Sequence, residues 1–189
     1  MHALNLHAIL PRSRANGPGM RTVIWVQGCS LRCPGCFNPE THAHKPARLV
    51  PVDRLVSEIQ HAGRAIEGIT ISGGEPLEQP EGLNALLRRV KERTDLSVIL
   101  FSGHTLAEIE RMPHADSVPA MVDVLIAGRF VEALRLSHGL RGSSNQTIHL
   151  LSDRYDVRQV EESPVGEISI DRRGVMSVTG IDPPLIVRR

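Results

Sequence analysis

Short apolar segments alternate with amphipathic ones along most of the chain. The apolar segments are rich in β-branched residues and comprise residues 22–26, 68–72, 96–101 and 122–127. Between them, residues 53–66 and 81–93 repeat apolar side chains at the spacing of a helix with one buried face. Strands that alternate with helices predict βα units built on a mostly parallel sheet.

Weaker patterns predict the remaining elements. Thr105 opens a helix, because Glu108 follows at the capping-box spacing. Three further elements are a short helix over residues 130–136, a last parallel strand over 145–151 and an added edge strand over 4–10. Two alternating segments around a turn predict a β-hairpin, and they are residues 167–170 and 175–179.

The elements together predict an α/β fold, an open, partial βα barrel of about five or six parallel strands with a C-terminal β-hairpin extension. Such a count falls short of the roughly eight strands that close an α/β barrel. We expect residues 1–151 to form the partial-barrel domain and residues 152–189 to pack on it as the extension.

Glycine-rich and polar segments follow the predicted strands. They are residues 29–36, 73–76, 102–104 and 128–130. In parallel α/β folds the loops after the strands meet at one face, and sites are built there. The sequence therefore predicts that four chemically unusual loops meet in one place.

Composition excludes several classes of function. The chain has 189 residues, enough for one domain, and its 22 Lys and Arg nearly balance its 21 Asp and Glu. A near-neutral charge and few aromatic side chains argue against a nucleic-acid binder. No apolar run of about 18 residues predicts a membrane span, and the first residues lack the apolar stretch of a signal peptide. We therefore expect a cytoplasmic protein.

The only three cysteines, Cys29, Cys33 and Cys36, lie within one short segment. An odd number of closely spaced thiols favours a metal site over disulfides. Thiolates suit zinc or iron–sulfur centres. Zinc would need a fourth ligand, which His42 or His44 could supply, whereas a cubane cluster would keep one iron open to a non-protein ligand.

The spacing of the cysteines resembles the signature of the radical S-adenosylmethionine superfamily, and Gly73-Gly74-Glu75-Pro76 resembles its methionine-binding strand end. Other segments resemble the activating subunit of anaerobic ribonucleotide reductase and the activating enzymes of glycyl-radical enzymes more generally. Those segments are residues 17–21, 27–29, 33–38, 123–130 and 141–146. The resemblance covers roughly residues 12–150.

The resemblance implies that Cys29, Cys33 and Cys36 hold a [4Fe-4S] cluster whose fourth iron binds S-adenosylmethionine. Reductive cleavage would give methionine and a 5′-deoxyadenosyl radical, which abstracts hydrogen from a target. The expected target is a glycine of a partner glycyl-radical enzyme or other polypeptide. A low-potential donor such as flavodoxin or ferredoxin would supply the electron. Two alternatives stay open, namely a radical enzyme with a small-molecule or peptide substrate and a non-catalytic zinc-binding module.

The same resemblance suggests residues that bind S-adenosylmethionine. The backbone of Gly73 and Gly74 would contact the methionine ammonium, whose charge Glu75 complements, and Ser102 would hydrogen-bond the ribose or the carboxylate. The whole expected set is Phe37, Gly73, Gly74, Glu75, Pro76, Ser102, His104, Gly128 and Asn145.

Two kinds of position in the sequence allow more than one interpretation. Many superfamily members have an aromatic residue before the last cysteine, where this chain has Gly35. Phe37 would then either replace that apolar contact or pack in the core. Candidates for carboxylate or substrate contacts, which could equally be ordinary surface arginines, are Arg21, Arg129 and Arg141.

Overall fold

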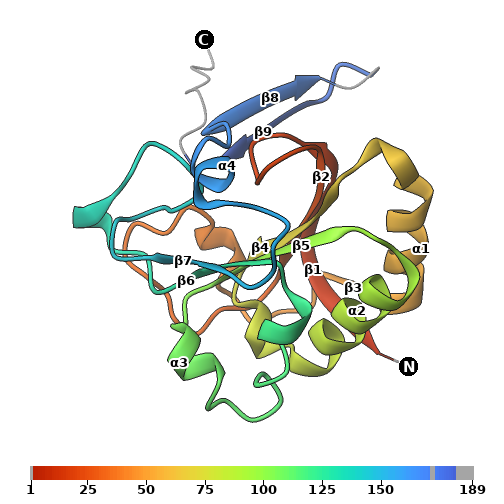
Figure 1. The fold of residues 1–189 in the computed structure, drawn as a ribbon, viewed down its shortest axis with the longest axis horizontal. Coiled ribbons are helices and arrows are strands. Elements are labelled where there is room, and N and C mark those ends of the chain that lie inside the picture. Colours follow the sequence, from red (N-terminus) through yellow and green to blue (C-terminus); the bar gives the residue numbers. More distant parts are fainter. Residues whose placement is uncertain (1, 171–172, 182–189) are drawn as a thin grey trace.

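A computed structural model describes residues 2–170 and 173–181, and a seven-stranded sheet forms its centre (Figure 1). The order of the strands across the sheet is β3-β1-β2-β4-β5-β6-β7. Their bounds are β1 Ala3–Ser13, β2 Arg21–Val26, β3 Arg48–Pro51, β4 Gly68–Gly73, β5 Ser97–Ser102, β6 Val124–Ala127 and β7 Thr147–Leu150. The α/β class predicted from the sequence is confirmed.

Strands β2, β4, β5 and β6 run parallel, whereas β7 is antiparallel to β6. The prediction of five or six parallel strands, with residues 145–151 among them, is therefore wrong. A parallel connection needs a crossover to the opposite end of the sheet. Here the chain after β6 folds back on itself, with the N–H of Leu136 bonded to Gly142 O and that of Ser144 to Leu134 O, and re-enters the sheet at the end it left.

Strand β1 is longer than predicted, and it lies inside the sheet. It pairs antiparallel with β2 on one side and with β3 on the other, so β3 forms the edge. The sequence analysis missed β3, which has only four residues. Such a short segment carries too few alternating positions to be recognised as a strand.

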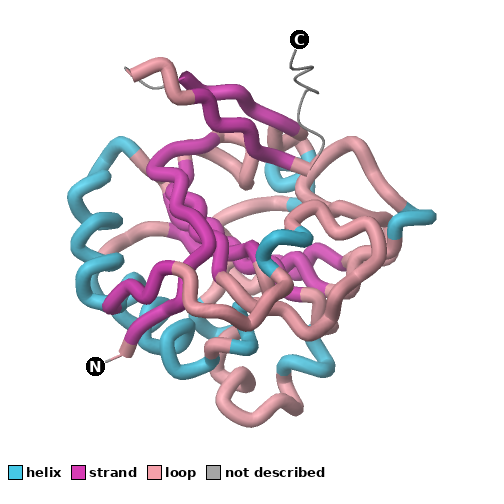
Figure 2. The backbone as a smooth tube through the Cα atoms, turned by 180° about the vertical axis from the view of Figure 1, so that it is seen from behind, coloured by secondary structure: helices cyan, strands magenta, loops and turns pink. Residues whose placement is uncertain are grey.

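The two long helices, α1 Val52–Ala62 and α2 Pro80–Arg93, pack on one face of the sheet, as Figures 1 and 2 show. Their apolar stripes bury Leu55 and Ile59 of α1 and Leu83 and Leu87 of α2 in the main core. Burial of such stripes against the sheet is the main stabilisation that these helices receive. Both helices agree with the predicted positions to within a few residues.

The shorter helices are α3 Leu106–Ile109 and α4 Val157–Glu161. Thr105 and Glu108 form the predicted capping box at the start of α3. The helix predicted over residues 130–136 is wrong, because only a single 3₁₀ turn, Glu132–Leu134, forms there. The hydrogen bonds that fold this segment back onto residues 142–144 replace helical ones.

The predicted hairpin is present as β8 Gly166–Ile170 and β9 Met176–Gly180, which form a separate two-stranded sheet. Two hydrogen bonds attach it to the chain after β1. The N–H of Arg14 donates to Glu167 Oε2 at 2.9 Å, and Asn16 Nδ2 donates to Thr179 Oγ1 at 3.0 Å. The hairpin thereby lies over the face of the sheet that the long helices leave uncovered (Figure 1).

Candidate active site

The cysteine loop, residues 29–36, directly follows β2 and the dipeptide Gln27-Gly28. All three cysteines are free thiols. Cys29 is buried, while Cys33 and Cys36 are partly exposed. The structure thus places the three thiols on one short loop at the end of a central parallel strand.

Backbone N–H groups point at the sulfur atoms. The N–H of Asn38 donates to Cys36 Sγ at 3.4 Å. Burial raises the pKa of the Cys29 thiol, and hydrogen bonds from the backbone of Arg32 and Leu31 act in the opposite direction. Such N–H···S bonds stabilise thiolates and help set the potential of a bound cluster.

Glu78 connects the cysteine loop to the segment after β4. Its carboxylate accepts from the N–H of Ser30 at 2.7 Å and from the Ser30 hydroxyl. The Nε2 atom of His44 lies 2.6 Å from the other carboxylate oxygen. Partial burial raises the pKa of Glu78, but the hydrogen bonds from Ser30 and His44 outweigh it and leave that pKa below its ordinary value. The carboxylate is therefore ionised at neutral pH.

Glycines allow the loops to approach one another closely. A Cβ atom on Gly74 would collide with the carbonyl oxygen of Gly28. Gly35 has a φ of 70°, and a Cβ atom there would lie 2.6 Å from the carboxylate carbon of Glu132. Gly74 thus requires glycine because the collision is with backbone, whereas the Glu132 side chain could move away from residue 35. At residue 35 it is the positive φ that disfavours any residue with a Cβ atom, an aromatic one included.

Glu75 and Ser102 form a buried pair that joins the ends of β4 and β5. The Glu75 side chain is 1% exposed and accepts from Leu77 N at 3.0 Å, Ser102 Oγ at 3.0 Å and Gly103 N at 2.8 Å. Burial raises the pKa of Glu75 to about 7 despite these three donors. Pro76, also buried, begins the turn that follows. Glu75 and Ser102 therefore bond to each other and to nearby backbone, and their expected contacts with a ligand stay a prediction.

The expected residues Gly128 and His104 contact Ser102 through the backbone, whereas Asn145 does not. The N–H of Gly128 donates to the carbonyl of Ser102 at 3.0 Å. His104 is partly buried, which lowers its pKa, and Nδ1 lies 3.9 Å from the carboxylate of Glu108. Asn145 is exposed and donates to the carbonyl of Arg129 at 2.8 Å. The Asn145 side chain therefore lies at the surface and binds the backbone after β6.

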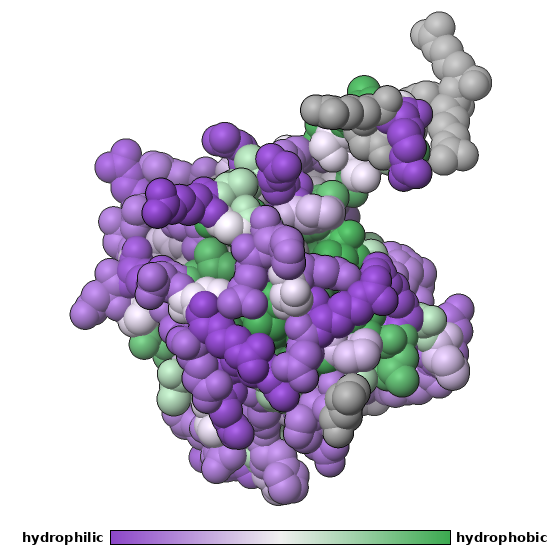
Figure 3. Space-filling view, turned by 90° about the vertical axis from the view of Figure 1, so that its right-hand side faces the viewer, coloured by the Kyte–Doolittle hydropathy of each residue, from purple (hydrophilic) through white to green (hydrophobic). Residues whose placement is uncertain are grey.

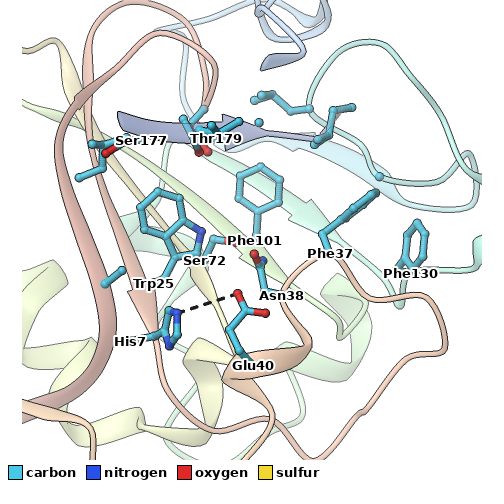
Figure 4. A pocket seen from close by; sticks show the side chains of 18 of the residues that line it. His7, Trp25, Phe37, Asn38, Glu40, Ser72, Phe101, Phe130, Ser177 and Thr179 are labelled. Carbon is cyan, nitrogen blue, oxygen red and sulfur yellow. Dashed lines mark hydrogen bonds and ion pairs between the residues drawn. The ribbon is translucent and has the colours of Figure 1, made fainter. Parts of the chain in front are cut away.

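Beside the cysteine loop, the uncovered face of the sheet encloses a cavity of about 570 Å³. Four of the five aromatic side chains line it, namely Trp25, Phe37, Phe101 and Phe130. The rings of Phe37 and Phe130 are tilted, with centroids 4.8 Å apart, and the guanidinium carbon of Arg135 lies 4.8 Å from the Phe37 centroid. Phe37 is thus part of the cavity wall rather than of the core (Figure 4).

Polar side chains line the opposite part of the cavity. His7 Nδ1 is 3.1 Å from Gln27 Oε1, and its Nε2 is 3.9 Å from the carboxylate of Glu40 (Figure 4). Asn38 and Ser72 also line the wall. Sequence analysis missed this polar group and Trp25. The available signal was that single polar or aromatic residues interrupt otherwise aliphatic strands.

The three candidate arginines do not reach the cavity. Arg21 is fully buried, and its guanidinium donates to Thr70 Oγ1 at 2.8 Å, Ile69 O at 2.7 Å and Tyr155 OH at 3.1 Å, among other acceptors. Arg129 and Arg141 form ion pairs with Glu108 and Glu161. Arg21 is therefore buried and holds the sheet together, which rules out a surface position. Substrate contacts by Arg129 or Arg141 stay a prediction.

The described residues contain no group of three or more His, Cys, Asp or Glu side chains close enough to hold a single metal ion. His44, one candidate fourth ligand for zinc, bonds to Glu78. His42 has its Nε2 buried and without a hydrogen-bond partner. A mononuclear site formed by the cysteines and these histidines is therefore not preformed. Three thiols that stand apart on a loop suit a larger cluster, in which iron and sulfide atoms fill the space between them.

The fold and the cysteine loop define a single-cluster iron–sulfur protein of the radical S-adenosylmethionine superfamily. The family described as "4Fe-4S single cluster domain" matches residues 15–149. An anaerobic ribonucleoside-triphosphate reductase-activating protein from Vibrio cholerae is 35% identical over 159 residues, which cover 77% of this chain and 97% of that protein. Its counterpart from Escherichia coli K12 is 31% identical over 78% of this chain and 99% of its own length. The chain belongs to the family of anaerobic ribonucleoside-triphosphate reductase-activating proteins.

A second class of activating enzyme matches a shorter part of the chain. The pyruvate formate-lyase-activating enzyme of Staphylococcus epidermidis is 40% identical over 92 residues, or 46% of this chain and 37% of that enzyme. The similarity thus extends to activating enzymes with different partners. Among the helices of the described residues, none is long and apolar enough to cross a membrane.

The donor set fits the cofactors of this family. The three free thiols and the N–H group directed at Cys36 form a loop suited to thiolate ligation of a [4Fe-4S] cluster. The close backbone approach of Gly74 to Gly28 holds the segment after β4 against the start of this loop. Phe37 and Asn38, which directly follow the last cysteine, line the aromatic cavity. This cavity offers space for S-adenosylmethionine beside the cysteine loop.

Proposed function

We propose that this protein generates a glycyl radical on a partner anaerobic ribonucleoside-triphosphate reductase. The observation that carries the proposal is the position of the cavity. Phe37, the residue after the last cysteine, lines the cavity. A substrate bound in the cavity would therefore lie beside the cysteine loop that holds the cluster. When bound, the cluster and S-adenosylmethionine supply an electron and a 5′-deoxyadenosyl radical for hydrogen abstraction. The rest of the chemistry is binding, orientation and exclusion of water by the residues of this chain.

Cys29, Cys33 and Cys36 would hold the cluster as thiolates. The backbone of Gly73 and Gly74, next to the strand that precedes the cysteine loop, would contact the ammonium group of S-adenosylmethionine. The N–H of Gly74 already donates to Val26 O at 2.8 Å, so an ammonium group would be left to the carbonyl oxygens. Carbonyl oxygens are acceptors, which is the polarity that an ammonium group requires.

Phe37 would provide an apolar surface for the adenine and its neighbouring atoms, because it lies in the cavity wall against Phe130. Gly128, without a side chain, would let the ligand pass closely, while the buried carboxyl of Glu75 would hold the ends of β4 and β5 in register. His104 and Asn145 would then shape the surrounding loops through their contacts with Glu108 and with the carbonyl of Arg129.

A polypeptide target accounts for the open side of the sheet. A protruding loop could enter a cavity that would be too small for a folded domain. A cytoplasmic location and a low-potential electron donor such as flavodoxin or ferredoxin are part of the same proposal.

The deciding experiment combines reduced, cluster-loaded protein with S-adenosylmethionine and the reductase of the same organism. A glycyl radical detected by electron paramagnetic resonance supports the proposal, and 5′-deoxyadenosine without any such radical refutes it.

One observation favours a second candidate function. Ser177 and Thr179 of the hairpin line the cavity and partly enclose it, which is an arrangement suited to a small-molecule or peptide substrate (Figure 4). A product formed from a small molecule in the absence of any partner protein would favour this candidate. Stoichiometric zinc without iron or sulfide in anaerobically prepared protein would instead point to a non-catalytic binding module.

A further inference from the structure

A β-bulge directs His7 into the cavity. The pairing of β1 with β2 skips one residue between Leu6 and Ala8, and that residue is His7. Two neighbouring residues, His7 and Ala8, consequently both line the cavity. A regular strand would turn neighbouring side chains to opposite faces of the sheet. Bulges beside active sites commonly redirect a side chain in this way.

Gln27 fixes which nitrogen of the His7 ring carries the proton. The amide nitrogen of Gln27 donates to the carbonyl oxygens of Ala43 at 2.7 Å and of Glu40 at 3.3 Å. The amide oxygen of Gln27 therefore faces His7 Nδ1, 3.1 Å away, and this oxygen only accepts. In the neutral ring the proton is consequently on Nδ1, and Nε2 carries a lone pair.

The Nε2 atom of His7 is left as a hydrogen-bond acceptor on the cavity wall. Its distance of 3.9 Å to the Glu40 carboxylate is longer than a hydrogen bond, and no other described residue bonds to it. The His7 side chain is 34% exposed and that of Glu40 is 54% exposed, so a ligand in the cavity reaches both. Two neighbouring acceptors, one of them a carboxylate, require a ligand that brings N–H groups.

His7 lies apart from the residues expected to bind S-adenosylmethionine. Those residues lie at the ends of β4 and β5, after β6 or directly after the cysteine loop, whereas β1 is on the other side of β2 in the sheet. Figure 4 shows His7 toward one end of the cavity and Phe130 at the other. A ligand at His7 therefore lies beside S-adenosylmethionine, where the second substrate of the reaction has to be.

The cavity continues from His7 as a trough along β1. Residues 7–10 all line it, and each of them is at least partly exposed. At the rise of a β-strand these residues extend over roughly 10 Å. Figure 3 shows the surface hollowed below the hairpin, with apolar side chains in the hollow. A trough of this shape suits an extended polypeptide, whose main chain supplies N–H groups at regular intervals.

We propose that Nε2 of His7 accepts a main-chain N–H of the glycine-bearing segment and thereby sets how far that segment enters the cavity. The inference rests on the proposed function and adds a residue that positions the polypeptide. Glu40 offers a second acceptor to the same segment. His7 makes a hydrogen bond and transfers no proton, so it acts on binding of the polypeptide rather than on cleavage of S-adenosylmethionine.

Two substitutions separate the two nitrogens of the ring. In His7→Asn the amide nitrogen takes the place of Nδ1 and still donates to Gln27, but the acceptor at Nε2 is lost. In His7→Gln the amide oxygen reaches the position of Nε2 and keeps that acceptor. The matched control is His61→Asn, at an exposed histidine near the end of α1. Glycyl-radical formation by the cluster-loaded protein is measured against the concentration of the reductase.

We expect His7→Asn to raise the half-saturating concentration of the reductase about fivefold, which corresponds to the loss of one neutral hydrogen bond. The maximal rate stays close to that of the wild type, because the lost contact acts on binding. His7→Gln recovers most of the loss, and His61→Asn behaves like the wild type.

Equal half-saturation in the wild type and in His7→Asn overturns the inference and leaves the proposed function intact. In His7→Asn without the reductase, a rise in the concentration of S-adenosylmethionine needed for 5′-deoxyadenosine release assigns Nε2 to that cofactor, and also overturns the inference. A wild-type protein that releases 5′-deoxyadenosine but forms no glycyl radical refutes the proposed function, and the inference falls with it.

A second measurement starts from the wild-type protein. Peptides that span the glycine of the reductase carry an ester in place of one amide at a time, which removes a single main-chain N–H, and each is tested as an inhibitor of radical formation. We expect one ester position to weaken inhibition about fivefold, and His7→Asn to abolish that difference. Equal inhibition by the whole series, or none by the unmodified peptide, overturns the inference. A loss at one position that persists in His7→Asn overturns it as well.

Discussion

The carboxylate of Glu78 accepts the backbone N–H of Ser30 at 2.7 Å, one residue after the first cysteine. The same carboxylate holds His44, so one ionised side chain connects the cysteine loop, the segment around His44 and the turn after β4. A charged acceptor makes stronger hydrogen bonds than a neutral one. Glu78 is therefore a positioning residue for the cysteine loop.

Substitution of Glu78 separates its charge from its hydrogen bonds. Glu78→Ala should slow cluster assembly and shorten the lifetime of the cluster against a chelator, because Ser30 loses its acceptor. Glu78→Gln, which keeps an acceptor oxygen, should recover most of that loss. Both variants should raise the reduction potential, since a nearby negative charge disfavours adding an electron. Iron release and spectroelectrochemical titration measure the two effects.

The matched control is Glu81→Gln, at an exposed carboxylate near the start of α2. It should leave both the potential and the rate of iron release at the wild-type values. Equal potentials in the wild type and in Glu78→Gln would show that the charge of Glu78 does not act on the cluster.

Removal of a single cysteine should abolish the cluster without unfolding the protein. In Cys33→Ala the iron content is expected to fall from about four atoms per chain to nearly none, because two thiolates cannot retain a cubane cluster. The thiol is partly exposed and outside the main core, so the circular dichroism spectrum should stay unchanged. Iron and sulfide analysis of anaerobically purified protein makes the measurement. Full iron content in Cys33→Ala would contradict the assigned ligands.

Tyr155 connects the segment after β7 to the main sheet. Its hydroxyl donates to Glu67 Oε1 at 2.7 Å and accepts from Arg21 Nη1 at 3.1 Å, and Ser97 Oγ lies 2.7 Å away. The ring packs in a core cluster with Ile99 and other residues of the sheet. We propose on these contacts that the described residues after β7 and the partial barrel unfold as one unit.

Arg21→Met should lower the free energy of unfolding by about 3 kcal/mol, because its acceptors stay buried without a donor. Tyr155→Phe should cost about 1–2 kcal/mol and leave a single unfolding transition. Urea unfolding of the cluster-free protein measures both. Arg64→Met, at an exposed position, is the control and should change little. Two separate transitions in the wild type would contradict a single folding unit.

Much of the fold was predictable because helices and parallel strands leave periodic patterns. The stripe of α2 and the buried strands β4 and β5 appeared at nearly the observed residues. The direction of β7 was not predictable in this way. The four residues of β7 have the same pattern of side chains whether the strand runs parallel or antiparallel to β6. The hydrogen bonds that fold the preceding loop back on itself decide which of the two forms.

The cysteines were predictable because their spacing is local and their chemistry is specific. The contacts of Ser102 and Glu75 were not, since each residue could face a ligand or its neighbour, and only packing decides which. The hairpin is a related case, because its polar Thr179 is buried against the molecule while its apolar Ile168 and Ile170 are exposed. Alternation reveals that a segment has two faces, but the position of the rest of the molecule determines which face is exposed.

The raised pKa of Glu75 should make stability depend on pH in a recognisable way. Burial lifts its pKa from an ordinary 4.5 to about 7, so the folded state binds the proton more tightly than the unfolded state does. This group therefore lowers the free energy of unfolding as pH rises from about 4.5 to about 7, and its effect is constant above that range. The total contribution is roughly 3 kcal/mol.

Comparison with Glu75→Gln isolates this contribution, because glutamine does not titrate. Other carboxylates act in the opposite sense, since the pKa of Asp123 is lowered, but they are common to both proteins. The free energy of unfolding of cluster-free protein is measured in urea at several pH values between 4.5 and 8. The difference between wild type and variant should shift toward the variant as pH rises above about 4.5 and should level off near pH 7. Parallel curves would show that Glu75 titrates normally and that the ends of β4 and β5 are open to water at this carboxyl.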